Sequence, residues 1–132
     1  MTDLYAALLS WAIQLSGYPA PIVLPIVAMV SHSELERLAC AGRTCRVLGW
    51  YAGGDTVYLD ERMDVRRTFD SSILVHEFVH YLQGASGRYS VHYDCAESIA
   101  LEREAYGVQQ SYLVAYGDYR PIQAMHAAGC GE

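Results

Sequence analysis

The chain has 132 residues, and 52% of them are hydrophobic, which suits one domain with a modest core. Its formal net charge of −6 and isoelectric point near 5.2 argue against nucleic-acid binding, because such proteins carry a basic surface. The longest apolar run, residues 22–30, is about half as long as a membrane span and contains Pro25. We therefore expect one soluble domain over residues 1–132, with no membrane partner.

The chain is predicted to begin with an amphipathic helix, Asp3–Ser16. Large apolar residues at positions 4, 8, 11 and 15 recur with helical spacing. Thr2 or Asp3 can cap the start of this helix, and Gly17 ends it. A signal peptide is the rival interpretation, but Asp3 stands where a basic segment is expected and no small-residue cleavage site is evident.

Shorter elements are predicted between residues 18 and 60. Prolines at positions 19, 21 and 25 favour extended backbone, which leads into a first strand, Ile26–Val30. A short helix follows over Ser33–Ala39, capped by Ser31 or Ser33. Two further strands, Arg46–Tyr51 and Thr56–Leu59, are joined by a Gly-Gly-Asp turn at positions 53–55, which predicts a hairpin.

The next helix, capped by Asp70 or Ser71 and closed by Gly84, contains the sequence His-Glu-x-x-His at positions 76–80. Residues four apart lie one turn above each other, so His76 and His80 project side by side and can hold one metal ion. Glu77 lies beside them, where it can take a proton from a water molecule. The flanking residues are apolar nearly all round, so we expect this helix to be buried, and a zinc ion to compensate its polar side chains.

A second long helix is predicted from about Asp94 to Tyr116, ended by Gly117. With Glu97 as the origin of the helical register, Glu104 falls on the same apolar face, whereas Glu102 falls on the opposite, solvent-facing side. A carboxylate on an apolar face needs a partner, and zinc is a natural one. The register alone does not choose between Glu97 and Glu104 as the third ligand.

The His-Glu-x-x-His helix followed by Glu104-Ala105-Tyr106 resembles the zincin metallopeptidases, and within them the compact gluzincins, minigluzincins and ImmA/IrrE-like peptidases. The resemblance implies zinc (Zn2+) held by His76, His80 and Glu104. It also implies an α+β fold, in which a short three-stranded sheet packs on the His-Glu-x-x-His helix and a second long helix carries the third ligand. Other third ligands considered are Glu97, His92 and Asp94.

A site of this kind implies a zinc-dependent peptidase that hydrolyses peptide or protein substrates, with Glu77 as general base. A donor for the developing oxyanion is expected among Tyr89, His92 and Tyr93 of the inter-helix loop, or at His126. An edge of the hairpin is expected to hold an extended peptide by strand addition, as in zincins. The alternatives are a non-catalytic binding module that zinc stabilises, and a regulator or toxin protease that acts on a single partner protein.

The four cysteines, at positions 40, 45, 95 and 130, lack the Cys-x-x-Cys spacing of a structural zinc site. Cys40 and Cys45 flank a tight loop that a local bridge would close, and Cys95 with Cys130 would tie down the C-terminal tail. Two disulfides predict an oxidising compartment, periplasmic or extracellular after secretion. The alternative is four reduced thiols in a cytoplasmic protein.

Overall fold

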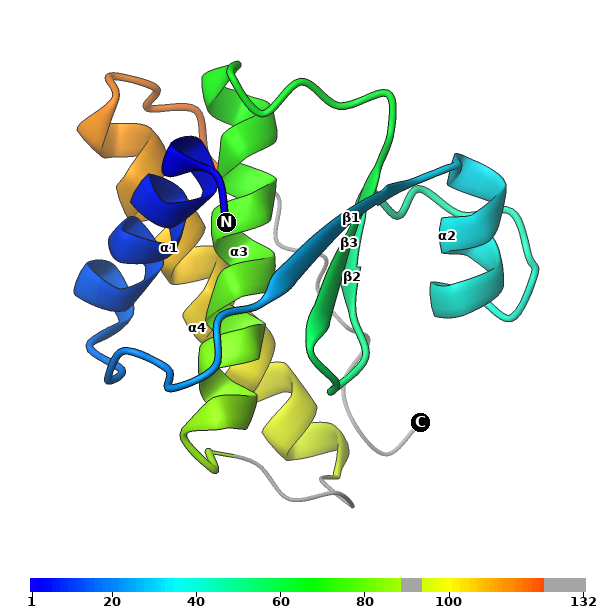
Figure 1. The fold of residues 1–132 in the computed structure, drawn as a ribbon, viewed down its shortest axis with the longest axis horizontal. Helices are drawn as coiled ribbons and strands as arrows, with labels where there is room; N and C mark the ends of the chain where they lie inside the picture. The colour runs from blue at the N-terminus through cyan, green and yellow to red at the C-terminus, as the bar shows by residue number, and fades with distance from the viewer. Residues whose placement is uncertain (89–93, 123–132) are drawn as a thin grey trace.

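The computed structural model describes residues 1–88 and 94–122 and has an α+β fold, as predicted (Figure 1). Within these residues, four helices accompany one three-stranded sheet. The elements in chain order are α1 (Asp3–Ser16), β1 (Ile26–Val30), α2 (His32–Ala39), β2 (Gly49–Tyr51), β3 (Thr56–Asp60), α3 (Thr68–Ala85) and α4 (Cys95–Ala115).

Helix α3 forms the centre of the fold (Figure 1). It packs against α1 and α4 on one side and against β2 and β3 on the other, while α2 lies beyond the sheet. Its apolar side chains are therefore enclosed: Leu74, Val75, Phe78 and Val79 are fully buried. The predicted burial of this helix is confirmed.

The described sheet has the strand order β1-β3-β2. Strand β1 runs parallel to β3, and β2 runs antiparallel to β3 through the predicted hairpin. Both β1 and β2 are thus edge strands of this sheet. The alternation of side chains along β3 directs Val57 and Leu59 into the core.

Capping side chains set the starts of three helices, and the caps of α1 and α2 are among those predicted. Thr2 caps α1 by accepting a hydrogen bond from the Tyr5 N–H, and Gly17 ends it in the left-handed conformation, with φ of 80°. Ser31 caps α2 in the same way, and Asp94 caps α4. Local chemistry therefore decides these ends.

The predicted bounds of two elements, β2 and α3, are wrong. Strand β2 begins at Gly49 rather than Arg46, because Cys45 is held away from the sheet by His32 and Glu36. Helix α3 begins at Thr68 without a side-chain cap and extends to Ala85. The Asp70 carboxylate instead accepts a hydrogen bond from the Asp64 N–H, so it orders the preceding turn.

Cys40 and Cys45 form the predicted disulfide. The second predicted bridge needs Cys130, which lies outside the described residues. None of the helices in the described ranges is long and apolar enough to cross a membrane.

Candidate metal centre

Helix α3 brings the two histidines of the motif together at its buried face. The Nε2 atoms of His76 and His80 lie 3.2 Å apart, as expected for residues one turn apart. His76 is 6% exposed, and the ring of Tyr106 from α4 packs against its ring with centroids 4.5 Å apart. The two imidazoles are thus held by the packing of α3 against α4.

The carboxylate that completes this cluster belongs to Glu102 of α4. Its Oε1 atom lies 3.3 Å from His76 Nε2 and makes a closer contact with His80 Nε2. Among residues 1–88 and 94–122, His76, His80 and Glu102 form the group of potential metal ligands whose donor atoms lie within 4.8 Å of one another. We refer to these three residues as the His76–His80–Glu102 cluster.

The structure does not place Glu104 with the histidines. Its carboxylate accepts hydrogen bonds from the Tyr18 hydroxyl and from Gln83 Nε2, the latter at 3.1 Å, and lies 3.7 Å from Arg88 Nε. The predicted orientation of Glu102 away from the histidines is wrong, because Glu102 contacts both of them while its side chain stays partly exposed. Glu97 lies in the first turn of α4 and is not part of the cluster.

The error lies in the helical register. The buried face of α4 is centred near Ala105, and it includes Gln109 and Leu113, which the register based on Glu97 leaves out. At about 100° per residue, Glu102 and Glu104 flank this face on its two sides. Glu102 then faces the histidines, and Glu104 faces the end of α1.

Two buried glutamines fix the orientation of the histidine rings. The Nδ1 atom of His80 lies 2.8 Å from Gln83 Oε1, and that of His76 lies 3.0 Å from Gln109 Oε1. Gln83 is 0% exposed and Gln109 4%. Because both amide oxygens accept from the rings, each Nδ1 carries a proton, and each Nε2 atom is directed toward Glu102.

Three acceptor atoms therefore converge, since a neutral imidazole with a protonated Nδ1 presents a lone pair at Nε2. Such an arrangement requires a positive charge at its centre, either a proton or a metal ion. Burial lowers the pKa of His80, but its hydrogen bond with Glu102 and the charges of Glu77 and Glu102 outweigh this and raise the pKa to about 9. Burial raises the pKa of Glu102, but the two histidines hold it well below its usual value.

The three residues of the cluster could hold a divalent ion. Tetrahedral zinc with ligands at about 2.0–2.1 Å sets neighbouring ligand atoms about 3.3 Å apart. Two of the three ligand separations match this value: His76 Nε2 lies 3.2 Å from His80 Nε2 and 3.3 Å from Glu102 Oε1, whereas His80 Nε2 and Glu102 Oε1 lie closer together than this. Two imidazole nitrogens and one carboxylate oxygen are also a common zinc donor set.

Glu77 lies next to the cluster without belonging to it. Its Oε2 atom is 4.0 Å from His76 Nε2, and the residue is 8% exposed. Gly49 of β2 faces it so closely that a Cβ atom at that position would lie 2.9 Å from Glu77 Cγ. The sheet edge and the carboxylate are therefore neighbours, and only a glycine leaves the side chain of Glu77 in this position.

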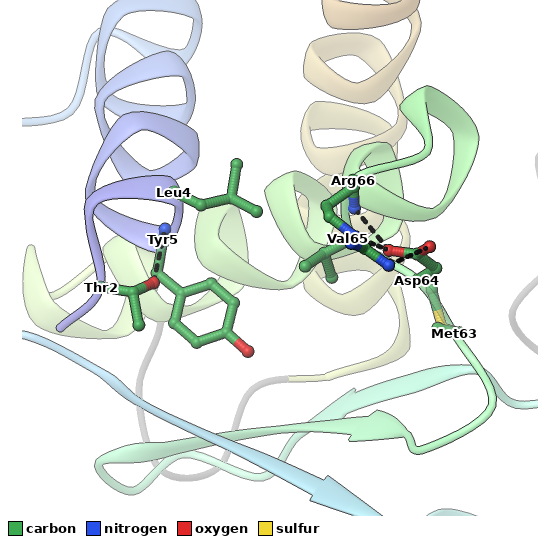
Figure 2. Close-up of a pocket in the computed structure, with 7 residues that line it drawn as sticks. All are labelled: Thr2, Leu4, Tyr5, Met63, Asp64, Val65 and Arg66. Atoms are coloured by element: carbon green, nitrogen blue, oxygen red, sulfur yellow. Dashed lines mark hydrogen bonds and ion pairs between the residues drawn. The ribbon is translucent and has the colours of Figure 1, made fainter.

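A separate open groove lies between the start of α1 and the segment before α3 (Figure 2). Its lining contains one acidic and one basic side chain, Asp64 and Arg66, which pair with each other at 3.0 Å. No residue of the His76–His80–Glu102 cluster lines this groove. This groove is therefore separate from the cluster on α3 and α4.

A family model described as a domain of unknown function (DUF6647) matches residues 1–131. The chain belongs to the DUF6647 family. No curated protein and no solved structure matches it significantly.

The sequence does not predict the roles of three residues of this candidate centre, Glu102, Gln83 and Gln109. A signal for them exists: Glu102, Tyr106 and Gln109 recur at helical spacing along α4, and Gln83 follows His80 by three residues. The candidate oxyanion donors Tyr89, His92, Tyr93 and His126 lie outside the described residues.

Proposed function

We propose that the protein is a zinc-dependent metallopeptidase, with His76, His80 and Glu102 as the metal ligands and Glu77 as the general base. The observation that carries this proposal is the convergence of three acceptor atoms, two imidazole nitrogens and one carboxylate oxygen, beside a second carboxylate, that of Glu77. Glu102 replaces Glu104 in the ligand set that the sequence predicts. The resemblance to zincins in the His-Glu-x-x-His helix supports the same assignment.

A zinc ion held by His76, His80 and Glu102 would supply a Lewis acid that polarises a carbonyl group and acidifies water. Glu77 then accepts a proton as the water oxygen bonds to the carbonyl carbon of the substrate. When the carbon–nitrogen bond breaks, Glu77 passes a proton to the leaving amine. Its position 4.0 Å from His76 Nε2 places it beside the ligand atoms, as this role requires.

Three protein ligands favour a catalytic over a purely structural role. Structural zinc sites are closed by four protein ligands, whereas catalytic sites keep one position open. The described residues contribute three ligands, and the side chain of Glu102 is 38% exposed, so the cluster reaches the surface there. These features argue against a binding module in which zinc only stabilises the fold.

The neighbouring strand edge favours a peptide as substrate. The Leu48 C=O accepts from the Asp60 N–H at 2.9 Å, and the alternation along an antiparallel ladder then directs the N–H and C=O of Gly49 away from β3. An extended peptide that adds to this edge would pass beside Glu77. The Cys40–Cys45 disulfide supports action in the periplasm or outside the cell.

The decisive test is Glu77→Gln, assayed with a peptide library whose new termini are read by mass spectrometry. A library covers the case of a protease that acts on one partner sequence. We expect zinc to be retained and hydrolysis to fall about 100- to 10,000-fold, the usual contribution of a general base. Glu97→Gln is the matched control, because Glu97 is outside the cluster. Hydrolysis by Glu77→Gln at the wild-type rate would refute the role of Glu77.

Metal analysis of purified variants tests the ligand set separately. We expect one zinc ion per chain in the wild type and loss of zinc in His76→Ala, His80→Ala and Glu102→Ala. Glu104→Ala should keep its zinc with reduced affinity. Loss of zinc from Glu104→Ala but not from Glu102→Ala would restore the ligand set predicted from the sequence.

A further inference from the structure

A chain of hydrogen bonds connects His80 with the end of α1. Gln83, fully buried, accepts from His80 Nδ1 at 2.8 Å through its amide oxygen. Its Nε2 atom donates to the Leu101 carbonyl at 2.9 Å and to Glu104 Oε1 at 3.1 Å. Glu104 in turn accepts from the Tyr18 hydroxyl.

This chain has a fixed polarity. A glutamine amide can be flipped, which would turn its NH2 group toward His80. Two acceptors, the Leu101 carbonyl and the Glu104 carboxylate, lie on the other side and hold the NH2 group there. The amide oxygen must then face His80, so the Nδ1 atom of His80 carries the proton and Nε2 is free to bind a metal ion.

The chain of hydrogen bonds that holds the His76 ring is shorter than that of His80. Gln109 Nε2 donates to the Ser72 hydroxyl at 3.1 Å, and the Ser72 hydroxyl donates to the Phe69 carbonyl. No charged group takes part in this second chain. Glu104 is thus the charged residue that distinguishes the support of His80.

We propose that Gln83 is a positioning residue for His80, and that Glu104, held by Tyr18, acts through Gln83 to fix the ring for metal binding. The proposal rests on the proposed function in taking the His76–His80–Glu102 cluster as the metal site. It assigns to the half-buried carboxylate of Glu104 a role that is not metal ligation. Tyr18, which follows the end of α1, then helps to position His80 through its hydrogen bond to Glu104.

The first experiment measures zinc and cobalt affinity by competition with a chromophoric chelator. Gln83→Met keeps the volume of the side chain but removes the acceptor for His80, and we expect a 10- to 100-fold loss of affinity with an altered cobalt absorption spectrum. Glu104→Met should lose less, several-fold, because it acts indirectly. Gln110→Met, on α4, is the matched control: it removes the hydrogen bonds of Gln110 with the Arg120 carbonyl and the Ile122 N–H, away from the histidines.

An exchange variant separates positioning from a general loss of packing. Gln83→Glu alone sets two carboxylates against each other and should weaken metal binding. The combination Gln83→Glu with Glu104→Gln keeps an acceptor facing His80 and supplies an amide donor from position 104 to position 83, while the Leu101 carbonyl still lacks its donor. Affinity should therefore rise well above that of Gln83→Glu alone, toward the wild-type value. Wild-type affinity in Gln83→Met, or no rescue in the exchange variant, would overturn the proposal.

A metal-free measurement keeps this proposal distinct from the proposed function. The Nδ1–H of His80, hydrogen-bonded to a buried amide, should give a slowly exchanging NMR signal that Gln83→Met abolishes and Gln110→Met preserves. If the wild type binds neither zinc nor cobalt, the proposed function fails, and the His80 signal still decides the positioning role. A signal that survives in Gln83→Met would contradict it.

Discussion

Histidines meet carboxylates in two regions of this molecule, and the two clusters differ in the source of their positive charge. Beside the sheet, His32 Nδ1 lies 2.9 Å from Asp60 Oδ2, and His32 Nε2 lies 2.9 Å from the Cys45 carbonyl. Arg62 adds two side-chain hydrogen bonds to the fully buried Asp60, at 2.9 and 2.6 Å. Both ring nitrogens and both carboxylate oxygens have protein partners, so this cluster is complete without a ligand.

The His76–His80–Glu102 cluster is built from the same residue types but lacks the arginine. Within the described ranges, the ion pairs of Glu102 are made with the two histidines alone. Each ring keeps its Nε2 atom for the shared centre, because a glutamine occupies Nδ1. Proximity of histidine and carboxylate is therefore not enough to indicate a metal site; the deciding feature is whether the fold supplies the compensating cation.

Addition of zinc should have the largest effect on the stability of the folded protein. A ligand present at about 1,000 times its dissociation constant stabilises the folded state by about 4 kcal/mol. For a domain of this size we expect the unfolding temperature to rise by about 10–20 °C, measured by calorimetry with zinc and with a chelator.

Two variants tie this rise to one cluster. His80→Ala should abolish the rise, whereas His32→Ala should lower the unfolding temperature without zinc and leave the rise intact. A rise that disappears in His32→Ala would mean that the comparison of the two clusters is wrong.

Asp60→Asn tests the cluster of His32, Asp60 and Arg62, which is complete without a ligand. The substitution should lower the free energy of unfolding by about 2 kcal/mol, since hydrogen bonds to charged groups contribute about 1.5–3 kcal/mol. The hydrogen bond from Arg62 is the main cause that holds the pKa of Asp60 far below its usual value. Because the folded-state pKa is depressed, this stabilisation is complete above the unfolded-state pKa of about 3.9 and is lost as the pH falls below it. Urea unfolding at pH 7 and pH 3 should therefore show that the free energy of unfolding falls less on acidification in Asp60→Asn than in the wild type.

Removal of the Cys40–Cys45 disulfide by a double serine substitution should cost about 2 kcal/mol, the value expected for closure of a very short loop. The bridge borders the His32 cluster, because the Cys45 carbonyl is bonded to His32. Zinc affinity should not change. A parallel loss of stability and zinc affinity would show that the two regions are coupled through the sheet.

The parts of the fold that local chemistry determines could be predicted from the sequence. The caps of α1 at Thr2 and Gly17 and the bounds of β1 agree with the structure because each depends on neighbouring residues. The start of β2 could not be predicted, because contacts of His32 and Glu36 with Cys45 displace residues that have strand propensity.

In the candidate site, too, local features could be predicted from the sequence and features set by packing could not. The pairing of His76 and His80 follows from their spacing within one helix. The choice between Glu102 and Glu104 depends on how α4 is rotated against α3 and α1, and this rotation is set by buried residues such as Gln109 and Leu113. The two glutamines could not be recognised as ring partners before that rotation was known.

Gly49→Ala has the smallest expected effect. It tests whether the position of Glu77 affects the rate of hydrolysis without affecting zinc affinity. The added Cβ atom would lie 2.9 Å from Glu77 Cγ, so the side chain of Glu77 must move away from its place beside His76. We expect hydrolysis to fall about tenfold, which corresponds to about 1.4 kcal/mol in the barrier, with zinc affinity unchanged. Gly54→Ala, in the same hairpin but with no atom within 4 Å of the added carbon, is the matched control and should behave as the wild type. Equal activity of the two variants would mean that Glu77 tolerates displacement, which a general base in contact with the reacting water does not.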